Sequence, residues 1–171
     1  MTERIQEFLR NRRSEGLDTE PCLVVDLEVV RDNYQTFAKA LPDSRVFYAV
    51  KANPSPEVLQ LLASMGSCFD TATVAEIEMA LAAGATPDRI SYGNTIKKER
   101  DIARAFALGI RLFAVDCAAE VEKVARAAPG AKVFCRILYD CAGAEWPLSR
   151  KFGCDPEMAV EVLDLAKRLG L

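Results

Sequence analysis

The spacing of hydrophobic positions along this chain switches repeatedly between a pattern typical of strands and one typical of helices. Short apolar runs of strand length are each followed by about ten residues or more with apolar positions three and four apart, the spacing of an amphipathic helix. Glycine or proline marks most changes of period. The pattern predicts five successive strand–helix units, with strands at 45–50, 68–70, 90–92, 112–115 and 132–139 and helices at 55–66, 73–84, 97–108, 118–128 and 155–170.

Three elements precede these units. The pattern predicts a helix near 2–13, a short strand at 22–25 and a helix at 27–41. Asp26 is placed to cap the second of these helices, because a carboxylate before the first turn accepts its free backbone N–H groups. Further along, Pro56 suits a first helical turn and is expected to begin the next helix.

Strands that alternate with helices predict a parallel sheet, for which two architectures compete. A doubly wound dinucleotide-binding sheet would carry a G-x-G-x-x-G motif after its first strand, and this chain has none there. Five successive units of similar size favour part of a (β/α)8 TIM-type barrel. Five strands do not close an eight-stranded barrel, so we expect an open sheet edge and an uncovered apolar interior.

One lysine marks a candidate site. Lys51 directly follows the apolar run 45–50, and Asn53-Pro54 ends the predicted strand soon afterwards. A lysine amine at the end of a buried strand is a candidate nucleophile for a Schiff base. The alternative is a strand-end lysine that extends its ammonium into water.

Composition narrows the functional classes. The 171 residues are 50% hydrophobic, enough for one substantial core, and the net charge of −3 without a basic tract argues against a nucleic-acid surface. The six cysteines lack metal-ligand spacing, so we expect reduced thiols, no metal site and a cytoplasmic protein. No segment resembles a signal peptide or a membrane span.

The string FYAVKANP at 47–54 resembles the pyridoxal-phosphate (PLP) lysine motif of the alanine-racemase-like, fold-type III decarboxylases. The resemblance covers nearly the whole chain and is strongest for the bacterial-type ornithine and lysine decarboxylases. Diaminopimelate and biosynthetic arginine decarboxylases are less similar. The other segments that carry it are 21–26, 66–78, 89–97 and 148–153.

This resemblance implies a domain organisation. Residues 1–26 would be a helix and a strand that join a mostly absent β-domain, and residues 27–171 would be a partial PLP-binding barrel. In the family, the remainder supplies a histidine against the cofactor ring, a glycine-rich phosphate loop and a glutamate on the pyridine nitrogen. It also supplies a cysteine and an aspartate from the partner subunit. This chain has no histidine at all, and we expect the isolated 171 residues to be inactive.

The resemblance also assigns cofactor-binding residues. Lys51 would hold PLP covalently, Ala49 would let its ring approach closely, and Asp70 and Arg136 would contact it. Asp70 could instead cap a helix or lie free in a loop. Arg136 interrupts the apolar run 132–139, which predicts a buried side chain, and it could form a structural ion pair inside the barrel.

Two further residues have possible supporting roles. Glu76 would lie near the site on the helix after the second strand, or it is simply a solvated glutamate. Lys151 matches a family lysine that reaches the other subunit's β-domain, or it is an exposed loop residue. We expect Asn53 to organise the turn after Lys51 and Trp146 to be exposed. Cys141 is not the family's catalytic cysteine.

The resemblance implies PLP-dependent decarboxylation of a basic diamino acid. L-Ornithine to putrescine is the foremost reaction and L-lysine to cadaverine the second, in polyamine biosynthesis by a cytoplasmic homodimer with active sites at the subunit interface. Alternatives are diaminopimelate or arginine decarboxylation, an amino-acid racemase on the same barrel, a non-catalytic decarboxylase-like regulator and a small cofactor carrier. No nucleic-acid or membrane partner is expected.

Overall fold

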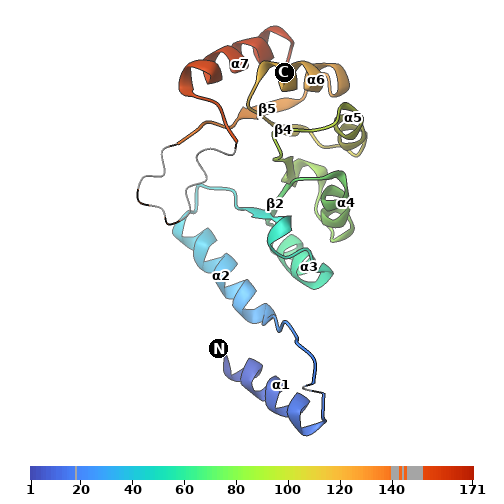
Figure 1. Cartoon of the computed structure of the whole chain (residues 1–171), viewed down its shortest axis with the longest axis vertical. Helices are drawn as coiled ribbons and strands as arrows, with labels where there is room; N and C mark the ends of the chain where they lie inside the picture. Colours follow the sequence, from blue (N-terminus) through green and yellow to red (C-terminus); the bar gives the residue numbers. More distant parts are fainter. Residues whose placement is uncertain (18, 140–142, 144, 146–151) are drawn as a thin grey trace. The chain divides into compact units, whose positions relative to one another are not determined.

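The computed structural model describes residues 1–17, 19–139, 143, 145 and 152–171 (Figure 1). The chain divides into two compact units, Met1–Ser44 and Arg45–Leu171. The first unit contains helices α1 (Glu3–Ser14) and α2 (Leu27–Ala40). Asp26 caps α2 as predicted, because its side chain accepts a hydrogen bond of 3.1 Å from the backbone N–H of Glu28.

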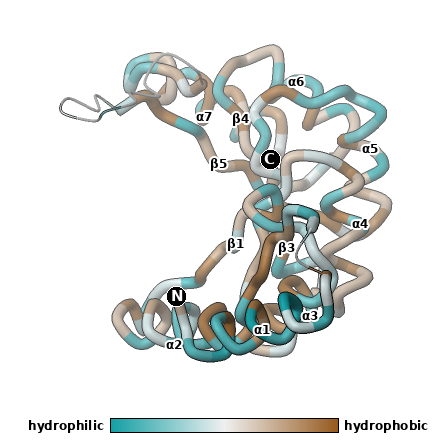
Figure 2. Tube along the Cα trace, turned by 60° about the horizontal axis from the view of Figure 1, so that its bottom comes forward, coloured by the Kyte–Doolittle hydropathy of each residue, from teal (hydrophilic) through white to brown (hydrophobic). Residues whose placement is uncertain are grey.

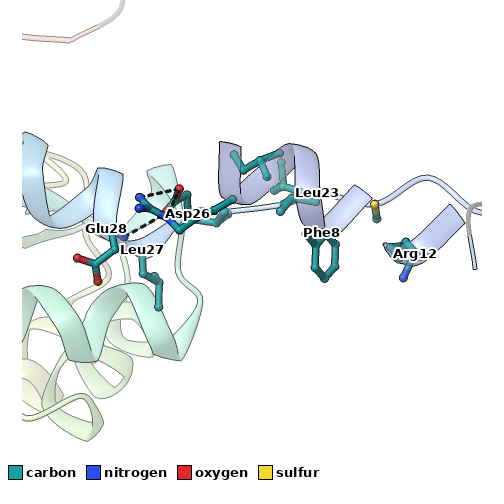
Figure 3. Close-up of a pocket in the computed structure, with 11 residues that line it drawn as sticks. Phe8, Arg12, Leu23, Asp26, Leu27 and Glu28 are labelled. Atoms are coloured by element: carbon teal, nitrogen blue, oxygen red, sulfur yellow. Dashed lines mark hydrogen bonds and ion pairs between the residues drawn. The ribbon is translucent and has the colours of Figure 1, made fainter. Parts of the chain in front are cut away.

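The strand predicted at 22–25 is not formed. A strand is defined by ladder hydrogen bonds, and the described residues offer this segment no partner. Asp26 nevertheless anchors its end to α1 (Figure 3), because Arg4 Nε and the Thr2 hydroxyl donate to Asp26 Oδ2 at 3.0 and 2.8 Å. These bonds hold the pKa of the Asp26 carboxyl below its usual value. Between α1 and this segment lies a hollow of about 700 Å³ with mostly apolar walls.

The second unit is a sheet of five parallel strands in the order β1-β2-β3-β4-β5. Sequential order is that of a barrel wall, whereas a doubly wound sheet reverses direction. The helices α3–α6 lie along one side of the strands (Figure 1). The strands are β1 (Phe47–Ala49), β2 (Cys68–Thr71), β3 (Ile90–Tyr92), β4 (Leu112–Val115) and β5 (Lys132–Cys135). The helices are α3 (Pro56–Ser64), α4 (Val74–Ala82), α5 (Glu99–Ala107), α6 (Ala118–Ala127) and α7 (Pro156–Arg168), with short 3-10 turns η1 (Val50–Ala52) and η2 (Pro87–Arg89).

The core lies between the strands and the helices. Successive strand residues point to opposite faces, and one set is buried together with the apolar stripes of the helices. Hydrophobic stretches coincide with β1 and β3, while α5 carries hydrophilic positions (Figure 2). The other face of the sheet remains uncovered, so that Phe134 keeps 39% of its surface exposed. The buried set includes Phe69, Tyr92, Phe113, Ile77, Ile102 and Val121.

Two strands are shorter than predicted. After Ala49 the chain enters the turn η1, so Lys51 lies on this turn and not directly at a strand end. β5 ends at Cys135 instead of 139, because the N–H of Arg136 makes the last bond to β4, at the carbonyl of Val115. A strand stops where its ladder partner stops.

The residues at both ends of α3 have the roles that the sequence predicted. Pro56 occupies the first turn of α3, and Gly66 follows the end of that helix with a φ of 86°, a conformation that favours glycine. Asn53 organises the turn before α3, since its Oδ1 accepts from the N–H of Ser55 at 3.0 Å. Among the described residues, no helix has the length and apolar character needed to span a membrane.

Candidate cofactor-binding site

Strand register places three of the candidate positions in one row. Ala49 pairs with Asp70 across β1 and β2, and Asp70 pairs with Ser91 across β2 and β3. Because paired residues of parallel strands point to the same face, these side chains share the uncovered face of the sheet. Lys51 follows two residues after Ala49, at the carboxyl ends of the strands, where barrel enzymes build their sites.

A cavity of about 530 Å³ occupies this face. It brings together Asp70 and Arg136, which lie far apart in the sequence, and it combines an acidic and a basic side chain with apolar walls. Such a combination suits a flat ring with polar substituents. Lys51 lies at the same edge of the sheet but does not line the cavity. The lining consists of Phe47, Asp70, Ser91, Gly93, Leu112, Phe134 and Arg136.

Asp70 is held by a neighbouring hydroxyl. The Oγ of Ser91 donates to Asp70 Oδ1 at 2.8 Å. The residue that caps α4 is Thr73, whose hydroxyl accepts from the N–H of Glu76 at 3.2 Å. The alternative of Asp70 as a helix cap is therefore wrong, and its carboxylate faces the cavity.

Arg136 differs from its prediction. Its side chain is exposed, not buried, because it lies past the end of β5 on the uncovered face. Its guanidinium carbon stands 5.3 Å from the ring centroid of Phe152, a cation–π contact. The ion pairs of the described residues do not include Arg136, so a structural ion pair finds no support there.

The remaining predicted residues have mixed outcomes. Lys51 is exposed, directly after the fully buried Val50. Glu76 accepts from the backbone N–H of Ala72 at 2.6 Å, so it supports the entry into α4 and is not a merely solvated glutamate. Lys151, Trp146 and Cys141 lie outside the described residues.

Ser91 and Gly93 line the cavity and were not predicted from the sequence. A Cβ atom on Gly93 would lie 2.0 Å from Asp70 Oδ1, so the carboxylate occupies space that only glycine leaves open. The available signal was Ser91 itself, a polar residue in the middle of the buried run 90–92.

A buried ion pair supports the rim beside Gly93. Lys97 Nζ lies 2.9 Å from Glu120 Oε1, and it donates to the carbonyl oxygens of Asn94 and Ala114 at 2.9 and 2.6 Å. The side chain of Lys97 is completely buried, and this burial lowers its pKa despite the nearby carboxylate. The pair fixes the chain between β3 and α5, next to the cavity.

Residues 27–171 match the family described as "Pyridoxal-dependent decarboxylase, pyridoxal binding domain". The chain belongs to this family. The five parallel strands and their helices correspond to the N-terminal barrel part of these decarboxylases, which confirms the predicted fold class and the resemblance.

Individual relatives agree with this assignment. The lysine/ornithine decarboxylase of Selenomonas ruminantium is 40% identical over 88% of this chain and 38% of its own length. A crystal structure of SrLDC in complex with PLP and cadaverine has a TM-score of 0.83 and 36% identity, over 100% of this chain and 42% of that one. Antizyme inhibitor 2 of Xenopus laevis is 35% identical over 98% of this chain and 37% of its length. The chain thus spans under two fifths of these curated relatives.

The residues present fit a pyridoxal group. The cavity offers a carboxylate, a guanidinium and a hydroxyl for polar substituents and aromatic side chains, Phe47 and Phe134, for a ring. A lysine amine stands at the same edge of the sheet. The described residues hold no cluster of metal-ligating side chains.

Proposed function

We propose that the protein containing this chain decarboxylates a basic diamino acid with PLP. L-Ornithine, giving putrescine, is the expected main substrate, and L-lysine, giving cadaverine, the second. The observation that carries this proposal is the single cavity shared by Asp70 and Arg136 at the strand edge where Lys51 lies. The similarity to a lysine/ornithine decarboxylase supports the substrate class.

Each residue has a proposed part in cofactor binding. Lys51 would hold the cofactor covalently through its amine, and Asp70 and Arg136 would bind its polar substituents. Ala49, in register with Asp70, would leave room for the ring. When bound, PLP supplies an electron-accepting ring that stabilises the negative charge left at the α-carbon as carbon dioxide departs. Glu76 and Lys151 would play supporting parts, at the entry to α4 and across the subunit interface.

We also propose a whole-protein context. Residues 1–26 would join a β-domain, and residues 27–171 would form part of a barrel whose other strands cover the cavity. Apolar side chains of the first unit support this, since Leu23 is 87% exposed and Phe8 47% exposed. The protein would be a cytoplasmic homodimer with active sites at the interface, acting in polyamine synthesis. The isolated chain would not turn over substrate.

A second candidate function is a non-catalytic regulator. The similarity to antizyme inhibitor 2 favours it, because that relative is 35% identical over nearly the whole chain. The joint presence of Lys51, Asp70 and Arg136 favours the enzyme. Diaminopimelate or arginine decarboxylation stays an alternative within the same chemistry.

Borohydride trapping tests the assignment of Lys51. The full-length protein is incubated with PLP, reduced and digested, and the modified peptide is identified by mass spectrometry. We expect the label on Lys51, its loss in Lys51→Ala and its retention in Lys98→Ala, a matched change at another exposed lysine of the same unit. Equal labelling of the Lys51→Ala protein would show that another residue holds the cofactor.

Carbon dioxide release then separates the functions. Ornithine, lysine, arginine and diaminopimelate are compared side by side with the same PLP-loaded protein. We expect release from ornithine first and lysine second. Release from diaminopimelate alone would overturn the substrate ranking, and PLP binding without release from any of the four would favour the regulator.

A further inference from the structure

The carboxylate of Asp70 is held from two sides by β3 and the residue that follows it. On one side, the Ser91 hydroxyl donates to Oδ1 at 2.8 Å. On the other, Gly93 leaves the space that the carboxylate fills, because a Cβ there would lie 2.0 Å from Oδ1 and 2.7 Å from Cγ. The carboxylate therefore has both a donor that attracts it and a gap that admits it.

The backbone around these residues is fixed independently of Asp70. The N–H of Gly93 donates to the carbonyl of Thr71 at 2.8 Å, a backbone bond between β2 and the residue after β3 that does not depend on any side chain. Ser91 is only 3% exposed, so bulk water does not replace the carboxylate as the hydrogen-bond acceptor of its hydroxyl. The second acceptor within reach of the Ser91 hydroxyl, the carbonyl of Phe69, lies at 3.5 Å, so the bond of 2.8 Å to Asp70 Oδ1 is the shorter one and fixes the direction of the carboxylate.

We infer that Ser91 and Gly93 are positioning residues that orient the Asp70 carboxylate toward the cofactor cavity. This inference rests on the proposed function, since it takes Asp70 to contact PLP. Neither residue needs to touch the cofactor for this role. Ser91 sets the rotamer of Asp70 by a hydrogen bond to a charged acceptor, and Gly93 keeps that rotamer free of collision.

The test measures PLP affinity of the full-length apoprotein by absorbance titration. Ser91→Ala removes the donor with little change in volume, and we expect the dissociation constant of PLP to rise by roughly tenfold, as for loss of a hydrogen bond to a charged group. Gly93→Ala should weaken binding at least as much, because the carboxylate must leave its place. In an Asp70→Ala background, neither change should weaken binding further.

A matched control separates positioning from stability. Thr71→Val removes a buried hydrogen bond of the same strand pair, which lies on the opposite face of β2 from Asp70. We expect it to lower the midpoint of thermal unfolding while the affinity for PLP stays unchanged. A general structural role for β3 would instead make Thr71→Val and Ser91→Ala weaken PLP binding alike, and this would overturn the inference.

The outcomes also distinguish this inference from the proposed function. If wild-type protein does not bind PLP, both are overturned. A second case is that PLP binds and Asp70→Ala weakens the binding. Only the inference then fails if Ser91→Ala leaves PLP affinity unchanged, or if it weakens binding equally with and without the Asp70 side chain. If Asp70→Ala leaves binding unchanged, the inference fails and Lys51 trapping still decides the function.

Discussion

The buried pair of Lys97 and Glu120 offers a quantitative test of the rim beside the cavity. Glu120→Gln keeps the shape of the side chain but leaves the ammonium of Lys97 buried without a carboxylate. The exposed fractions of the two side chains are 0% and 3%, so water cannot replace the lost charge. Removing one member of a buried ion pair costs about 3–5 kcal/mol. The amide oxygen still accepts hydrogen bonds, so we expect about 3 kcal/mol, the lower end of this range.

Urea unfolding of the full-length protein measures the loss as a lower midpoint at unchanged slope. Glu78→Gln is the matched control, because Glu78 pairs with Arg104 at 3.1 Å where both side chains are at least half exposed. Such a pair contributes at most about 1 kcal/mol. Joint replacement of Lys97 by Met and Glu120 by Leu removes both buried charges and should recover part of the lost stability. The recovery is partial because Lys123, whose side chain is 25% exposed, also pairs with Glu120 and loses that partner.

The pH dependence gives a second readout of the same substitution. Burial lowers the pKa of Lys97 in the folded protein below its ordinary value of 10.5, so the unfolded chain binds more protons in the window between the two values. The contribution of Lys97 to stability therefore rises as the pH increases through that window. Glu120 raises this pKa, so Glu120→Gln should steepen the rise. If Glu120→Gln and Glu78→Gln lowered the free energy of unfolding equally, this reasoning would be refuted.

Two further predictions concern α7 and the end of β5. Asp155 caps α7 by accepting from the N–H of Met158 at 2.8 Å, so Asp155→Ala should cost about 1 kcal/mol in urea unfolding. Asp155→Asn keeps the acceptor and should cost far less; equal losses would contradict the cap. Burial raises the pKa of the Cys135 thiol to about 12. Iodoacetamide should therefore label Cys135 far more slowly than the exposed Cys117 at neutral pH. The labelling rate of Cys135 should keep rising as the pH increases well above the ordinary thiol pKa of about 8.5. Equal rates for the two cysteines would contradict the raised pKa.

Local signals were sufficient for the alternation of strands and helices from residue 45 onward and for the cap at Asp26. Asp26 acts on the backbone N–H of Glu28, two residues away, so its role follows from the neighbouring residues alone. The alternation of strand-length and helix-length periods likewise predicted a parallel sheet with sequential order. The string around Lys51 indicated the family, because it specifies a lysine, its strand and the turn after it.

Contacts between distant segments decided the rest. Strand ends depend on the neighbouring strand, so β5 stopped at Cys135 and left Arg136 exposed where its apolar neighbours predicted burial. A segment becomes a strand only beside a partner, so residues 22–25 did not form one. In both cases the local pattern predicted more strand than the chain forms, and the missing information was the position of another segment.

The candidate site shows the same division. The sequence alone indicated Lys51, Asp70 and Arg136 as separate candidates, each in its own motif. That Asp70 and Arg136 share a cavity, and that Ser91 reaches Asp70 across 21 residues of sequence, followed only from strand register. Register is set by packing one whole face of the sheet against the helices, an interaction summed over many residues that no local pattern contains.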